Sequence, residues 1–147
     1  MPRADFVCVS RLRVRWAEVD MQKIVFNGHY LTYIDTAIAE YWRAIGLPYP
    51  HGYVERYASD VYLRKATVEY LGSARYDDLL EIGCRVSRLG RSSITFAFEI
   101  YREAEDAPLV TAELVYVNAD TSMKAVPLPE ELRSRVSGYE RVAPQSG

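Results

Sequence analysis

The sequence predicts one α+β domain in which a single antiparallel sheet wraps around one long helix. Residues 30–45 carry a continuous apolar helix face over more than four turns. Five further segments have the composition or the alternation of strands, and the last four are joined by short connections rich in turn residues. Because a helix this apolar must be covered along most of its length, we expect a curved five-stranded sheet around it.

The composition is that of an ordinary globular protein. The 147 residues are 49% hydrophobic and 26% charged, which predicts one domain over residues 1–147 with a single core. A net charge of −2 argues against a nucleic-acid-binding surface. No apolar run resembles a signal peptide or a membrane span, so we expect a cytoplasmic protein without membrane insertion. Cys8 and Cys84 are too few for a disulfide framework and are predicted to be small buried side chains.

The long helix has recognisable start and stop signals. Asn27 is a suitable N-cap, because its short side chain could accept a hydrogen bond from a free backbone N–H of the first turn. Gly46 would end the helix in a left-handed conformation, and Pro48 would prevent it from resuming. The apolar face that we expect to be buried consists of Tyr30, Tyr33, Ile34, Ala37, Ile38, Tyr41, Trp42 and Ile45.

The remaining segments supply the sheet. In the first strand, within Val7–Trp16, Leu12, Val14 and Trp16 alternate with arginines that we expect on a solvated face. Short connections between the later strands favour antiparallel pairing, because parallel pairs need long crossovers. An irregular loop is expected at Pro48–Ser59, a short helix at Pro129–Val136 and a disordered tail at Ala143–Gly147, so the ordered core would span about residues 6–137. The later strands are predicted at Asp60–Tyr70, Leu79–Leu89, Ser92–Arg102 and Leu109–Asn118.

A candidate site precedes the long helix. Asp20 lies seven residues before Asn27, so a short, mostly apolar loop joins this carboxylate to the helix start. Free N–H groups at a helix start are preorganised donors for a developing oxyanion, and a carboxylate can act as nucleophile or general base. Taken alone, Asp20 is more typical of a turn or capping residue than of a catalytic one.

The segment Asp20–Asp35 resembles the active-site motif of the 4-hydroxybenzoyl-CoA thioesterase family of hotdog-fold acyl-CoA thioesterases. The matching features are Asp20, the run Ile24-Val25-Phe26 and Tyr30 on the central helix. The resemblance extends over roughly residues 9–136, and it includes the segments Glu69–Asp78, Arg88–Ser93 and Val115–Asp120.

This resemblance implies a hotdog fold, with the long helix enclosed by the sheet, and hydrolysis of an acyl-CoA to a free acid and CoA. It implies Asp20 as nucleophile or general base, the backbone N–H of Asn27 as oxyanion donor, and Tyr30 as a further catalytic residue. It also implies homodimers, often paired into tetramers, with each active site between two subunits. Lys23 stands where many members have glycine, so the loop is expected to bend differently.

Other residues are candidates for substrate binding. Arg88, Arg91, Ser92 and Ser93 surround a tight turn at Gly90 and could bind the phosphates of CoA, although a solvated hairpin is an equally good interpretation. His29, in the first helical turn, could line the acyl pocket. CoA itself is part of the substrate, and no metal or redox cofactor is implied, because two histidines and two widely spaced cysteines form no ligand pattern.

Two alternative functions stay open at this stage. One is a hotdog dehydratase acting on a 3-hydroxyacyl thioester, for which His29 and Glu69 would be the acid–base pair. The other is a non-catalytic acyl-CoA-binding module that keeps the fold without turnover. An α/β-hydrolase mechanism is disfavoured, because the sequence has no Gly-x-Ser-x-Gly motif.

Overall fold

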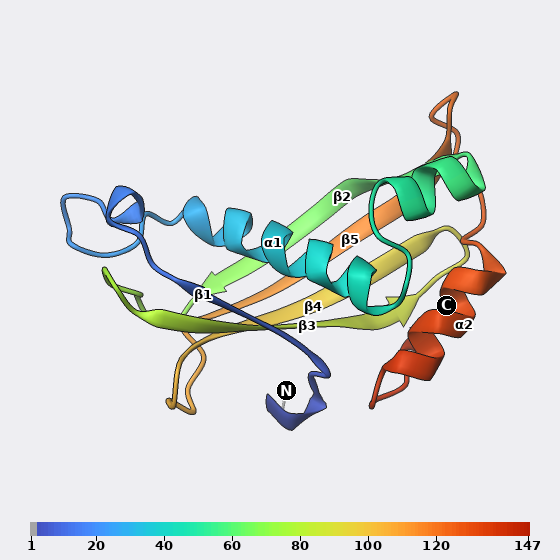
Figure 1. Cartoon of the computed structure of the whole chain (residues 1–147). Helices are drawn as coiled ribbons and strands as arrows, with labels where there is room; N and C mark the ends of the chain where they lie inside the picture. Colours follow the sequence, from blue (N-terminus) through green and yellow to red (C-terminus); the bar gives the residue numbers. More distant parts are fainter. Residues whose placement is uncertain (1–2) are drawn as a thin grey trace.

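A computed structural model describes residues 3–147 and contains one antiparallel sheet with a long helix lying across one face (Figure 1). The main strands follow the order β1-β3-β4-β5-β2, so the first two strands of the chain form the two edges of the sheet. The strands are β1 (Cys8–Arg13), β2 (Ser59–Tyr70), β3 (Leu79–Leu89), β4 (Ser93–Arg102), β5 (Val110–Asp120) and the short β6 (Gln145–Ser146). The helices are α1 (His29–Ala44) and α2 (Glu130–Tyr139), with short helical segments η1 (Arg3–Asp5), η2 (Trp16–Glu18) and η3 (His51–Glu55).

The core lies between α1 and the inner face of the sheet. Every residue of the predicted apolar helix face is buried, which confirms that the 3.6-residue period marks the packed face. Alternate residues of the central strands face α1, because side chains point to opposite faces along a strand. From β3 and β4 these buried residues are Leu80, Ile82, Cys84, Val86, Ile94, Phe96, Phe98 and Ile100, and both cysteines are free thiols as predicted.

The helix ends as predicted but begins differently. Gly46 has a φ of +80°, the left-handed conformation expected after the last turn. At the start, Gly28 occupies the N-cap position and no side chain caps the helix, so the prediction of Asn27 as N-cap is wrong. The reason is conformational. Gly28 already has helical φ and ψ values of −65° and −24°, whereas side-chain capping needs an extended residue there.

Two other boundaries differ from the sequence prediction. The first strand ends at Arg13, so Trp16 lies in η2 with its side chain 74% exposed and is not a buried strand residue. The tail is not wholly irregular, because Gln145 and Ser146 form β6, parallel to Arg88 and Leu89 of β3. Since β1 pairs with β3 only as far as Cys84, the end of that edge is available to the tail. Within residues 3–147, no helix has both the length and the apolar character of a membrane span.

A buried carboxylate, Glu140, joins α2 to the core. Its Oε2 accepts hydrogen bonds from the Tyr41 hydroxyl at 2.6 Å and from the Val86 N–H at 2.8 Å. Its Oε1 is buried and has no hydrogen-bond partner in the described part of the chain. Burial therefore raises the pKa of Glu140 above its ordinary value, although these two hydrogen bonds oppose the shift.

The raised pKa makes stability depend on pH. Because the folded protein holds the Glu140 proton more tightly, the contribution of this group is complete at low pH and is lost as pH rises through the folded pKa. We expect Glu140→Gln, which keeps one acceptor oxygen and cannot ionise, to become progressively more stable than the parent as pH rises from about 4.3, the ordinary pKa of a glutamate, through the folded pKa. Denaturant unfolding across this range measures the difference, and a parallel pH dependence of the two proteins would contradict the assignment.

Candidate active site

The loop that carries Asp20 lies at the end of the sheet where β1 meets the start of α1 (Figure 1). Its two sides are held together by a bridge between Val19 and Val25. The Phe26 N–H donates to the Glu18 carbonyl at 3.0 Å, and the Asp20 N–H donates to the Ile24 carbonyl at 3.0 Å. The loop is therefore a closed, hydrogen-bonded turn that leads directly into the helix.

The Asp20 carboxylate has one oxygen engaged and one available. Its Oδ1 accepts the Gln22 N–H at 2.8 Å, which forms an Asx turn. Its Oδ2 makes no hydrogen bond to any residue within 3–147, and the side chain is half-buried at the surface of the loop. The structural role expected of an isolated aspartate in a turn is thus present, and a free carboxylate oxygen remains for chemistry.

The turn passes through a left-handed residue at Lys23, whose φ is +66°. This conformation is easy for glycine and unfavourable for residues with a side chain. The loop therefore bends at Lys23 through a conformation that a glycine would adopt easily.

Two backbone N–H groups are free at the start of α1. Those of Asn27 and Gly28 make no hydrogen bond to any of residues 3–147, whereas the neighbouring Phe26 N–H is turned inward to Glu18. Both groups lie at the positive end of the helix dipole. The predicted oxyanion donor, the Asn27 N–H, is thus without a partner among residues 3–147, and its role stays a prediction.

Tyr30 links α1 to a second loop, residues 71–78. Its buried hydroxyl accepts the Ala74 N–H at 3.0 Å, while the Ala74 carbonyl accepts the Val25 N–H at 2.8 Å. Burial raises the pKa of Tyr30 above its ordinary value. The hydroxyl thus joins the two loops beside the helix start, a position that suits a supporting role more than contact with substrate.

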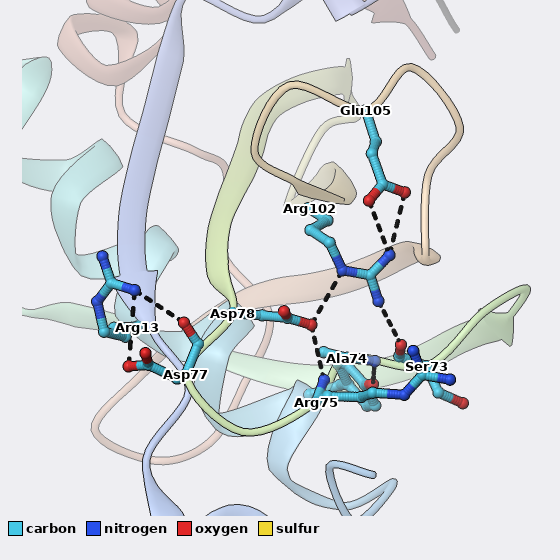
Figure 2. A network of polar contacts seen from close by, with 9 residues as sticks. Arg13, Ser73, Ala74, Arg75, Asp77, Asp78, Arg102 and Glu105 are labelled. Atoms are coloured by element: carbon cyan, nitrogen blue, oxygen red, sulfur yellow. Dashed lines mark hydrogen bonds and ion pairs between the residues drawn. The ribbon is translucent and has the colours of Figure 1, made fainter.

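The second loop is fixed by a network of charged groups (Figure 2). Arg102 donates to the Asp78 carboxylate at 3.0 Å, to the Ser73 carbonyl at 2.8 Å and to Glu105 at 3.0 Å. Asp78 also accepts the Arg75 N–H at 2.8 Å. These bonds fix the backbone of residues 73–78, and the Ala74 carbonyl within it bonds to the Asp20 loop at Val25.

Between the two loops lies a groove of about 610 Å³ that contains Asp20. It combines apolar and cationic side chains, and Met21 at its edge is fully exposed. Exposed apolar surface of this kind is typical of a binding site or an interface. The other lining residues are Trp16, Val19, Lys23, Arg75 and Tyr76.

His29 and Glu69 lie on different faces of the sheet. The His29 ring packs edge-on against Phe26, with a centroid separation of 5.9 Å, at the α1 side. Glu69 instead lines a groove on the outer face with Glu99 and Glu113. The acid–base pair proposed for a dehydratase is therefore not formed within this chain.

The hairpin Arg88–Ser93 is at the opposite end of the sheet from Asp20. β3 begins beside the end of β1 and runs for 11 residues before the hairpin, about 35 Å at the usual strand rise. The turn is held by Arg133, which donates to the carbonyls of Gly90 and Arg91. One chain thus does not bring the predicted phosphate-binding residues to its own Asp20.

Sequence analysis missed Glu18, the buried carboxylate nearest to the site. It is 5% exposed and accepts hydrogen bonds from Arg15 and from the Tyr33 hydroxyl. Its position two residues before Asp20 could have marked Glu18 as part of the site. Its partner Tyr33 lies on α1, however, and the sequence does not show that the two side chains meet. The described residues contain no group of three or more side chains suited to hold a metal ion.

Comparison with known proteins gives consistent results. The sequence pattern of the thioesterase superfamily matches residues 22–108. The acyl-CoA thioester hydrolase YbgC of Escherichia coli is 32% identical over 122 residues, which cover 82% of this chain and 89% of that protein.

Solved structures share the fold. A hypothetical protein from Aquifex aeolicus superposes with a TM-score of 0.78 at 28% identity, over 87% of this chain and 98% of its own. A 1,4-dihydroxy-2-naphthoyl-CoA thioesterase from Synechocystis superposes with a TM-score of 0.77 at 16% identity, over 87% of this chain and 93% of its own. The hotdog fold predicted from the sequence is confirmed.

The left-handed turn leads to a stability prediction. Lys23→Gly removes the backbone strain, whereas Lys23→Ala removes the same side chain and keeps the strain. We expect the glycine variant to be more stable than the alanine variant by about 0.5–1 kcal/mol, the strain relief being partly offset by the greater freedom of glycine in the unfolded chain. Denaturant unfolding of both variants measures this difference, and an alanine variant of equal or greater stability would contradict it.

Proposed function

Because the chain belongs to the thioesterase superfamily, we propose that it hydrolyses an acyl-CoA thioester to a free carboxylic acid and CoA. The observation that carries this proposal is the free Asp20 Oδ2 in a loop that ends at the free N–H groups of Asn27 and Gly28. A thioester needs an attacking group and stabilisation of the charge that develops on its oxygen. The loop and the helix start can supply both.

In the proposed reaction the thioester carbonyl oxygen accepts hydrogen bonds from the Asn27 N–H and its neighbour at the helix start. Asp20 then either removes a proton from a water molecule that attacks the carbonyl carbon, or attacks that carbon itself to form a mixed anhydride that water cleaves. The C–S bond breaks, the sulfur leaves as the CoA thiol after protonation, and the acyl group gains the oxygen of water. Both routes require an ionised Asp20.

The groove suits the two chemically different parts of such a substrate. Trp16, Met21 and Tyr76 offer apolar surface to an acyl group, and His29 lies at the adjacent helix start. Lys23 adds a cation of the kind that binds phosphates. This mixture supports an acyl-CoA as the substrate class.

A homodimer would explain the exposed edge of the sheet. β2 is twelve residues long, and among residues 3–147 it pairs through β5 alone. Leu63 on this edge strand is 52% exposed. Long, exposed edge strands are templates for pairing with another chain. We propose antiparallel pairing of β2 with its copy in a second subunit, with two such dimers able to form a tetramer.

The proposed dimer also gives the β3–β4 hairpin a role. Antiparallel pairing of two β2 strands reverses one subunit relative to the other. The hairpin end of one sheet then lies at the same end of the joined sheet as the Asp20 loop of the other. Arg88, Arg91, Ser92 and Ser93 could thereby bind the phosphates of a CoA whose thioester lies in the other subunit's groove.

The central test is Asp20→Asn. The asparagine Oδ1 can still accept the Gln22 N–H, so the turn and the stability should be kept while the negative charge is lost. We expect kcat for thiol release from acetyl-, octanoyl- or benzoyl-CoA to fall about 10²–10⁴-fold. Asp20→Ala, which loses the turn as well, should also be less stable.

The outcomes of this test separate the candidate roles. An asparagine variant with the parent's rate would make Asp20 a structural residue only. A parent that binds these acyl-CoAs without releasing thiol would be a binding module and would overturn the proposed activity.

The proposed dimer is tested by placing a charge on each edge of the sheet. Leu63→Lys puts an ammonium group on the β2 edge, and Val9→Lys puts one at a residue of the other edge strand that is similarly exposed, at 48%. In sedimentation equilibrium we expect the parent and the Val9 variant to have at least twice the chain mass of 16.8 kDa, and the Leu63 variant to shift towards monomer. A monomeric parent, or a Leu63 variant that assembles like the parent, would contradict the proposal.

A further inference from the structure

Glu18 is a buried acceptor whose lone pairs are all directed to neighbouring groups. Its Oε1 accepts the Arg15 N–H at 2.8 Å and the Tyr33 hydroxyl at 2.8 Å. Its Oε2 accepts two hydrogen bonds from the Arg15 guanidinium, one from Nε at 2.9 Å and one from Nη2 at 2.6 Å. With two donors on each oxygen and almost no exposed surface, the side chain is closed to substrate.

The backbone of Glu18 is tied to the same site. Its carbonyl accepts the Phe26 N–H at 3.0 Å, which closes the Asp20 loop one residue before Asn27. One residue therefore contacts the strand exit through Arg15, the helix through Tyr33 and the far side of the loop through Phe26. These are the elements that determine where Asp20 lies relative to the start of α1.

The charge of Glu18 suits this arrangement. Burial disfavours the ionised carboxylate, but the hydrogen bonds from Arg15 and Tyr33 outweigh it and lower the pKa of Glu18 below its ordinary value. The Tyr33 pKa is raised by burial and by the bond to Glu18, so its hydroxyl keeps the proton that it donates. Hydrogen bonds to an ionised acceptor are shorter and stronger than neutral ones, which makes this junction rigid.

We propose that Glu18 is a positioning residue for thioester hydrolysis, which fixes the Asp20 carboxylate relative to the helix-start N–H groups through its bond to Tyr33. This inference rests on the function proposed above, because it assumes that Asp20 and those N–H groups act on one thioester. Small displacements of reacting groups are costly, since a misplacement of about 1 Å can lower a rate about 10²-fold. Loss of the hydrogen bonds among Arg15, Glu18 and Tyr33 should therefore lower kcat by a larger factor than it raises KM.

The chain offers a matched control at the other end of the same helix. The Tyr41 hydroxyl donates to the buried Glu140 carboxylate at 2.6 Å, as Tyr33 does to Glu18. Tyr33→Phe and Tyr41→Phe each delete one buried α1 hydroxyl that donates to a carboxylate outside the helix. Of the two, Tyr33 alone is joined to the Asp20 loop, so a general loss of stability and a loss of positioning can be separated.

The experiment measures kcat and KM of the parent and its variants with whichever of acetyl-, octanoyl- and benzoyl-CoA the parent cleaves fastest. We expect Tyr33→Phe to lower kcat about 10-fold with KM changed less than about twofold, and Tyr41→Phe to leave kcat within about twofold of the parent. Glu18→Gln should lower kcat about 10²-fold, because its amide N–H₂ would face the donors of Arg15. If that variant does not fold, the two tyrosine variants still decide the question.

A double variant tests whether the effect passes through Asp20. Adding Tyr33→Phe to Asp20→Asn should lower kcat by less than about twofold further, because residues that act as a unit are not additive. The positioning role would be overturned if Tyr33→Phe and Tyr41→Phe lowered kcat equally, or if Tyr33→Phe had the kcat of the parent. In either case an inactive Asp20→Asn would leave the proposed function intact. A parent without thiol release would overturn both.

Discussion

The structure depends on covering the apolar face of α1. This face runs along the whole helix, and each large apolar side chain that it buries contributes about 1.5–3 kcal/mol. A flat sheet would cover part of it, so the strands curve around the helix and meet it with alternate residues of their inner faces. The chain therefore has little freedom in where the helix starts: the start lies where β1 leaves the sheet.

The position of the helix start brings free N–H groups and a carboxylate loop together. The first N–H groups of a helix have no partner within the helix, and here the packing of α1 leaves them beside a loop that contains a carboxylate. The loop cannot be held by a hydrophobic core of its own, so polar bonds hold it instead. Glu18 contacts it on one side, and Tyr30 with the Ala74 backbone contacts it on the other. The helix thus fixes the loop that carries Asp20 and the second loop beside it.

The sequence predicts well what depends on local periodicity. The helix face and the later strands follow from spacing alone, and the Asp20 motif stands out through its resemblance to a family. The errors concern interactions between distant segments. Asn27 looks like a cap, but the next residue, Gly28, occupies the N-cap position with helical φ and ψ values, and no side chain caps the helix. Trp16 continues an alternating pattern, but β1 ends at Arg13 and the chain turns into η2, which leaves Trp16 exposed. Glu18 shows no pattern, because its partner Tyr33 is defined by the fold.

The same reasoning explains why the site accepts an unfavourable residue at its tightest bend. Lys23 adopts a left-handed conformation in a turn closed by two hydrogen bonds of Asp20, whose Oδ1 accepts the Gln22 N–H and whose N–H donates to the Ile24 carbonyl. Lys23 also lines the groove beside Asp20 and gives it a positive charge. A glycine would relieve the backbone strain and remove that charge, so at this position backbone stability and the proposed binding of phosphates favour different residues.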